Sequence, residues 1–122
     1  MAYQNLVITR AGPQSLHKSW LCTYQHRNFD VLVAAYDRAA MARDEAGLEH
    51  ILIPGPKVRG WHQLFQLRPD LVRRYRSIAL IDDDIKTKPG DVIRCFDYGA
   101  DLELSIWQPS LTWTATSHLA SH

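Results

Sequence analysis

The sequence predicts an α/β domain in which a mainly parallel sheet is flanked by helices. Short apolar runs alternate with helix-prone segments four or five times along the 122 residues, and this alternation is typical of strand–helix units in a parallel sheet. One of the runs, residues 77–81, has no polar alternation, which favours a strand buried on both faces. A chain of this length has room for a single domain with a modest core.

The first strand is expected over residues 5–9, because this apolar run stops at Gly12 and Pro13, which enforce a turn. A helix is expected over residues 14–24, with Ser15 available as its cap. The chain therefore opens with a strand, a glycine-containing loop and a short helix. The glycine fingerprint of dinucleotide sites is absent from that loop.

A second strand is predicted over residues 29–36, because its valines favour extended structure. The alanine-rich segment 38–46 that follows is helix-prone. One long helix over residues 30–46 is the competing interpretation of this region. A third strand is predicted over residues 50–53, where a Pro-Gly-Pro sequence stops it.

Helical periodicity returns over residues 57–75, where Pro69 either starts a second helical piece or kinks a single helix. The apolar strand at 77–81 comes next. A short helix over residues 91–98 and a further strand over residues 102–107 complete the predicted pattern.

Composition excludes several classes of protein. The net charge is +1, and no basic run is interleaved with aromatic residues, so a nucleic-acid partner is not expected. No stretch of about 18 apolar residues predicts a membrane span, and the N-terminus does not resemble a secretory signal. Cys22 and Cys95 have no metal or redox spacing, so we expect reduced thiols in a cytoplasmic protein.

Three consecutive carboxylates, Asp82, Asp83 and Asp84, follow the apolar strand directly. Such strands present their functional groups at the carboxyl end of the sheet, where α/β proteins bind ligands. Adjacent carboxylates repel one another, so a cation is expected to neutralise them. Oxygen ligands at this density suit Mn²⁺ or Mg²⁺. The alternative is a solvated acidic turn.

Charged residues also follow the other predicted strands. Arg10 comes after the first strand, Asp37 after the second and Lys57 after the third, so a parallel sheet brings them to the edge that carries the aspartates. A metal with open positions and nearby cations is suited to displacement of a nucleoside diphosphate. The alternatives are surface charges for Arg10 and Lys57, and a helix cap for Asp37.

The apolar strand followed by Asp82-Asp83-Asp84 resembles the DXD motif of GT-A glycosyltransferases, with Asp82 and Asp84 as its two acids. The Tyr-Asp pair that closes the second strand and Lys57 at the start of a helix are similar too. The stretch 108–111 also resembles bacterial glycosyltransferase-like proteins. The resemblance spans about residues 5–118.

The resemblance implies a nucleotide-sugar transferase that uses Mn²⁺ or Mg²⁺. It implies that residues 1–122 form one Rossmann-like domain, the donor-binding half of a GT-A fold. Asp84 is then the direct metal ligand, and Asp82 contacts the metal or the ribose. The residues that the resemblance places around the nucleotide-diphosphate sugar are Arg10, Asp37, Lys57, Asp82 and Asp83.

A complete GT-A domain is about twice this length, so the chain is expected to be incomplete. One alternative is therefore a non-catalytic nucleotide- or metal-binding module. In that case Trp107 and Trp113 mark an apolar C-terminal side that a homo-oligomer would cover. Phosphoryl transfer of the haloacid-dehalogenase type is a further alternative, but Lys86 stands where its motif has a small hydroxyl residue or valine.

Overall fold

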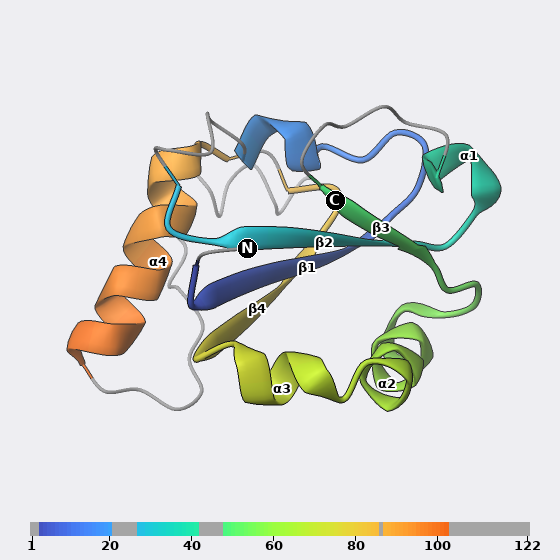
Figure 1. The fold of residues 1–122 in the computed structure, drawn as a ribbon. Coiled ribbons are helices and arrows are strands. Elements are labelled where there is room, and N and C mark those ends of the chain that lie inside the picture. Colours follow the sequence, from blue (N-terminus) through green and yellow to red (C-terminus); the bar gives the residue numbers. More distant parts are fainter. Residues whose placement is uncertain (1–2, 21–26, 42–47, 86, 103–122) are drawn as a thin grey trace.

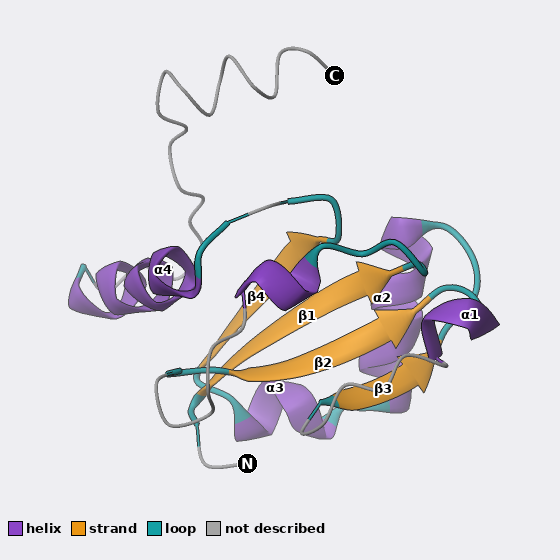
Figure 2. Ribbon diagram, turned by 90° about the horizontal axis from the view of Figure 1, so that it is seen from above, coloured by secondary structure: helices purple, strands orange, loops and turns teal. Residues whose placement is uncertain are grey.

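Four parallel strands form the centre of the fold (Figure 1). The computed structural model describes residues 3–20, 27–41, 48–85 and 87–102. The strands are β1 (Asn5–Ala11), β2 (Asp30–Ala35), β3 (Glu49–Leu52) and β4 (Ser77–Asp82). They lie in the order β3-β2-β1-β4, and every neighbouring pair is parallel (Figure 2). The predicted α/β class with a parallel sheet is confirmed, and the arrangement is Rossmann-like.

Helices cover both faces of this sheet. They are η1 (His17–Trp20, a 3₁₀ helix), α1 (Arg38–Met41), α2 (Lys57–Leu67), α3 (Asp70–Arg74) and α4 (Pro89–Asp101). In Figure 1, α2 and α3 lie below the sheet. Residues of η1 and α4 pack on the other face. In the described ranges, no helix has both the length and the apolar character needed to cross a membrane.

The core has two halves because successive side chains of a strand point to opposite faces. On one face, Leu6 and Ile8 of β1 pack with Leu64 of α2. On the other face, Val7 packs with Phe96 of α4. All five side chains are almost fully buried, and each such burial stabilises the fold by roughly 1.5–3 kcal/mol. Burial on both faces explains why Leu6, Val7 and Ile8 of β1 are three consecutive apolar residues.

The prediction that the strand before the aspartates is buried on both faces was wrong. In the described part of the chain β4 pairs with β1 alone, so it lies at the edge of the sheet, and Leu80 is 44% exposed. The strands buried along their whole length are β1 and β2, apart from Asn5 at the start of β1. An apolar run identifies a strand, but it does not reveal how many neighbours that strand has.

The first predicted helix is also largely absent from the described residues. Of residues 14–24, only the four of η1 are helical up to Trp20, and residues 21–24 lie outside the described ranges. The loop before η1 instead contacts the turn after β4, because Leu16 N donates a hydrogen bond to the carbonyl oxygen of Asp83 at 2.7 Å. That contact joins residues far apart in sequence, so local helix signals do not report it.

The segments around β2 and around Pro69 agree with the main predictions. β2 replaces the alternative of one long helix over residues 30–46, and α1 begins after Tyr36 and Asp37. Pro69 separates α2 from α3, as one of the two interpretations held, and it precedes the first residue of α3. The tail of the predicted α1 helix, residues 42–46, lies outside the described ranges.

The last described helix is longer than predicted. α4 already begins at Pro89, where a proline in the first turn has no intrahelical hydrogen bond to lose. Leu102, predicted to begin a strand, instead caps α4 by donating its backbone N–H to the carbonyl oxygen of Tyr98 at 3.0 Å. Residues 103–107 of that predicted strand, with Trp107, lie outside the described ranges, as do Cys22 and Trp113.

Candidate functional site

The charged residues that follow the strands gather at the carboxyl edge of the sheet. Arg10 pairs in register with Asp82 across β1 and β4, so the sheet itself sets their spacing. A cavity of about 310 Å³ opens at this edge. Its lining residues are Arg10, Tyr36, Gly55, Lys57, Asp82, Asp83 and Asp84. The structure therefore brings together five of the six predicted site residues, and Asp37 does not line the cavity.

The central aspartate of the triplet faces the protein. Gly12 N donates a hydrogen bond to Asp83 Oδ2 at 3.0 Å, and the Asp83 carbonyl accepts the bond from Leu16. Further along the same turn, Trp20 Nε1 donates to the carbonyl oxygen of Ile85 at 2.6 Å. These three bonds fasten the acidic turn to the loop after β1, and Asp83 supplies two of the acceptors.

Replacing Asp83 with alanine is expected to lower the free energy of unfolding by about 1–2 kcal/mol, because Gly12 N loses a charged acceptor. Asp83→Asn keeps an oxygen acceptor of the same size and is expected to recover at least half of that loss. Urea denaturation of the two variants measures the difference. Equal loss in both would show that the charge, and not the hydrogen bond, holds the turn.

Asp82 makes an ion pair at the mouth of the cavity. Lys57 Nζ lies 2.9 Å from Asp82 Oδ1, and the two side chains are 50% and 42% exposed. This hydrogen bond, helped by the nearby negative charges, raises the pKa of Lys57. The ammonium also lies 5.8 Å from the centre of the Trp61 ring. Lys57 thus stays protonated and close to the acidic turn, although an exposed pair of this kind adds little stability.

Asp84 differs from its two neighbours. Its side chain is exposed, and it makes no hydrogen bond or ion pair with other residues in the part of the chain that the structure describes. The three aspartates therefore have three different environments. Asp82 pairs with Lys57, Asp83 accepts a hydrogen bond from Gly12, and Asp84 lies exposed at the cavity. Of the three carboxylates, Asp84 is the one available to an external cation without breaking a described contact.

Arg10 is a buried cation whose hydrogen-bond partners are uncharged backbone carbonyl groups. Only 4% of the residue is exposed. Its guanidinium donates through Nη1 to the carbonyl oxygen of Ile53 and through Nη2 to that of Gly55, the second at 2.7 Å. Burial lowers the pKa of Arg10. Among the described residues, no carboxylate pairs with this guanidinium, so no described acid neutralises the positive charge that Arg10 brings to the cavity wall.

Two glycines make this arrangement possible. Gly60 of α2 lies against the guanidinium, and a Cβ there would come within 2.3 Å of Arg10 Cζ. Gly55 has a φ of 108°, a left-handed backbone conformation that glycine adopts without steric cost. That conformation forms part of the turn between β3 and α2, where the carbonyl oxygen of Gly55 accepts the bond from Arg10.

Asp37 caps a helix. Its Oδ1 accepts a hydrogen bond from the backbone N–H of Ala40 at 2.9 Å, the usual contact of an N-cap aspartate with the third residue of the helix. The structure thus gives Asp37 the capping role that was the alternative to ligand binding. Its contact with a nucleotide stays a prediction.

The cavity fits a metal ion only if a ligand supplies further oxygens. Within the described ranges, no group of three or more His, Cys, Asp or Glu side chains is arranged to hold a metal. Mg²⁺ is commonly bound by one or two carboxylates with phosphate oxygens completing the shell. Asp82 and Asp84 meet that requirement at the cavity, so the residues fit an ion shared with a phosphate ligand.

Comparison with protein-family models, with curated proteins and with solved structures finds no match for this chain. The geometry of the cavity is therefore the basis of the functional proposal below. Sequence reasoning missed two lining residues, Tyr36 and Gly55. Tyr36 directly follows the second strand, and Gly55 directly follows the third within Pro-Gly-Pro, so the rule that identified Arg10 and Lys57 also covers them.

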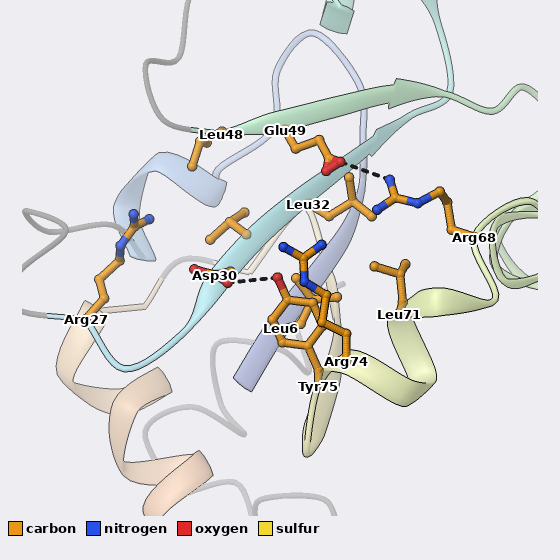
Figure 3. A pocket seen from close by; sticks show the side chains of 11 residues that line it. Leu6, Arg27, Asp30, Leu32, Leu48, Glu49, Arg68, Leu71, Arg74 and Tyr75 are labelled. Atoms are coloured by element: carbon orange, nitrogen blue, oxygen red, sulfur yellow. Dashed lines mark hydrogen bonds and ion pairs between the residues drawn. The ribbon is translucent and has the colours of Figure 1, made fainter. Parts of the chain in front are cut away.

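A second cavity, of about 320 Å³, lies at the opposite, amino edge of the sheet (Figure 3). Tyr75 Oη donates a hydrogen bond to Asp30 Oδ2 at 2.8 Å across its wall. Arg68 Nη1 donates to Glu49 Oε1 at 2.9 Å, and two further bonds join Arg68 to Asp70. Arg68 is thus paired with two acids, a structural use that its sequence position had not revealed.

Alkaline pH is expected to destabilise the fold through Tyr75. Burial, followed by the hydrogen bond to Asp30, raises the pKa of Tyr75 from 10.0 to about 12. The neutral phenol is therefore favoured in the folded state, and its contribution is complete below pH 10 and is lost as the pH rises toward 12. We expect the free energy of unfolding to fall by about 2 kcal/mol across this window.

Urea denaturation at several pH values tests this expectation. Tyr75→Phe should be less stable at neutral pH and should show a flatter profile between pH 10 and 12. Tyr98→Phe is the matched control, because Tyr98 is 60% exposed, and it should keep the wild-type slope. An unchanged slope in Tyr75→Phe would contradict the assignment.

Proposed function

We propose that this chain binds a nucleoside diphosphate-sugar together with Mn²⁺ or Mg²⁺, as the donor-binding part of a GT-A type glycosyltransferase. One observation carries the proposal: acidic and basic side chains line the same cavity at the carboxyl edge of a parallel sheet. Asp82 and Asp84 suit a metal ion, and Arg10 and Lys57 suit the phosphates.

Each residue has a role that follows from its contacts. Asp84 and Asp82 hold the metal, which neutralises charge on the leaving diphosphate when it is bound. Arg10 donates to phosphate oxygens from a fixed position, because two backbone carbonyls already orient its guanidinium. Lys57 adds a second positive charge at the mouth of the cavity. Asp83 keeps the acidic turn in place.

The proposal concerns donor binding. Transfer of the sugar also requires an acceptor surface and, in inverting members of the family, a base, and nothing among the cavity residues is assigned to either. A nucleotide-binding module without transfer activity would bind the same ligand through the same residues. A transferase and a binding module can be distinguished only by an assay of sugar transfer to an added acceptor.

Calorimetric titration of UDP and GDP, each with and without Mn²⁺, tests the proposal. Because the residues that the structure describes hold no group of three metal ligands, we expect weak binding of Mn²⁺ alone and much tighter binding when the nucleotide is present. The coupling must be reciprocal, so Mn²⁺ and the nucleotide should raise each other's affinity by the same factor. A folded protein that binds neither nucleotide in Mn²⁺ would overturn the proposal.

A further inference from the structure

The acidic turn already has a cation beside it. Lys57 Nζ lies 2.9 Å from Asp82 Oδ1, and Asp82 is one of the two carboxylates that suit a metal ion at the cavity. Among the residues that the structure describes, no other lysine or arginine forms an ion pair with the three aspartates. The ammonium and a divalent ion therefore compete for the same carboxylate.

The ion pair between Lys57 and Asp82 is easily displaced. Both side chains are exposed to solvent, and an exposed pair of this kind contributes little stability. Lys57 is also the first residue of α2, whose first turn holds no acidic residue, so the positive end of the helix dipole repels the ammonium. The contact with Asp82 is thus what holds the ammonium at the turn, and a divalent ion can take over that carboxylate at little cost.

The ammonium remains close to the cavity when it leaves Asp82. Lys57 is anchored at the start of α2, and its side chain lines the cavity together with Arg10. Trp61 lies one helical turn further along α2, and the centre of its ring is 5.8 Å from Lys57 Nζ. This ring packs against the hydrophobic core, so it attracts the ammonium from a fixed position. A lysine released from its acid therefore stays within reach of phosphate oxygens in the same cavity.

We propose that Lys57 is a placeholder cation, which pairs with Asp82 when no metal is bound and moves to the diphosphate when the metal takes Asp82. This inference rests on the proposed function of the same site. The exchange works in both directions, because a bound diphosphate attracts the ammonium and leaves Asp82 open to the metal. Lys57 therefore contributes to the coupling by which Mn²⁺ and the nucleotide raise each other's affinity.

Lys57→Met tests this exchange, because methionine keeps an unbranched apolar side chain and lacks the charge. We expect this variant to bind Mn²⁺ alone roughly 2- to 5-fold more tightly than the wild type, the factor that corresponds to the loss of an exposed ion pair. In Mn²⁺ it should bind UDP more weakly than the wild type, because a phosphate contact is lost. Electron paramagnetic resonance of free Mn²⁺ measures the first affinity, and calorimetry measures the second.

Arg59→Met provides the control for this test. It removes the same charge from the same helix, but Arg59 does not line the cavity, so both affinities should equal those of the wild type. A misfolded variant would bind both ligands more weakly, whereas the exchange predicts opposite changes for Mn²⁺ alone and for UDP in Mn²⁺. Thermal melting confirms that each variant is folded.

The outcomes separate this inference from the function on which it rests. If the wild type binds UDP in Mn²⁺ but Lys57→Met binds Mn²⁺ alone no more tightly than the wild type, Lys57 does not hold the place of the metal and the inference alone fails. Tighter Mn²⁺ binding with unchanged UDP binding would show that the ammonium does not reach the diphosphate, and would also overturn it. If the wild type binds no UDP in Mn²⁺, the proposed function fails and the inference with it.

Discussion

Replacement of Arg10 with methionine is expected to lower the free energy of unfolding by about 1–3 kcal/mol. Arg10 is 4% exposed, and its guanidinium donates to the carbonyl oxygens of Ile53 and Gly55. Methionine retains much of the aliphatic volume but leaves the buried carbonyl of Ile53 without a donor, and a buried acceptor that loses its partner costs about 1–3 kcal/mol. The Gly55 carbonyl is only partly buried and adds less. Urea denaturation measures the loss.

Arg59→Met is the matched control. Arg59 is an exposed arginine of α2, and an exposed substitution of this kind usually changes stability by less than about 0.5 kcal/mol. If the two variants were equally stable, the bonds from Arg10 to the loop between β3 and α2 would contribute nothing measurable to the free energy of unfolding.

Gly60→Ala probes the same contact from the other side. A Cβ at Gly60 would meet Arg10 Cζ at 2.3 Å and Arg10 Nε and Nη2 at 2.5 Å, so the guanidinium would have to move. We expect this variant to be destabilised in the wild-type background. In the Arg10→Met background the same change should be neutral or stabilising, because alanine favours a helix over glycine by about 1 kcal/mol. Additive effects would contradict direct packing.

The sequence predicted the sheet and the charged residues at its carboxyl edge because both follow from local patterns. An apolar run that meets a turn signal marks a strand, and parallel strands place Arg10, Lys57 and the aspartates at one edge. The same patterns do not indicate which strands lie next to one another in the sheet. For this reason the strand before the aspartates was expected to be buried on both faces, although β4 pairs with β1 alone in the described residues and Leu80 is exposed.

The roles of individual aspartates were the hardest part to predict. Asp83 and its two neighbours are equivalent in sequence. They are separated by contacts with distant residues, since Asp82 pairs with Lys57 and Asp83 accepts a bond from Gly12, 71 positions away. Asp37 was open to both capping and binding, and the bond from Ala40 shows the capping contact. Tyr36 was treated as the end of a strand, because exposure at a cavity depends on packing that no local pattern reports.

Asp84→Asn is expected to remove most of the metal dependence of nucleotide binding. Asparagine has the same size but lacks the charge that a divalent ion requires. Loss of even an indirect metal partner typically costs 10- to 100-fold in metal affinity, so we expect UDP affinity in Mn²⁺ to fall by at least about 100-fold. Asp101→Asn, an exposed change at the end of α4, is the control and should bind as the wild type does.

The same variant should behave in the opposite way without a metal. Without a metal, the negative charges of the aspartates that line the cavity repel a diphosphate, so removing the charge of Asp84 should slightly strengthen metal-free UDP binding. A variant that is merely misfolded would lose affinity under both conditions. Opposite changes with and without Mn²⁺ would therefore identify Asp84 as a metal ligand, whereas an intact response to Mn²⁺ would exclude it from the metal site.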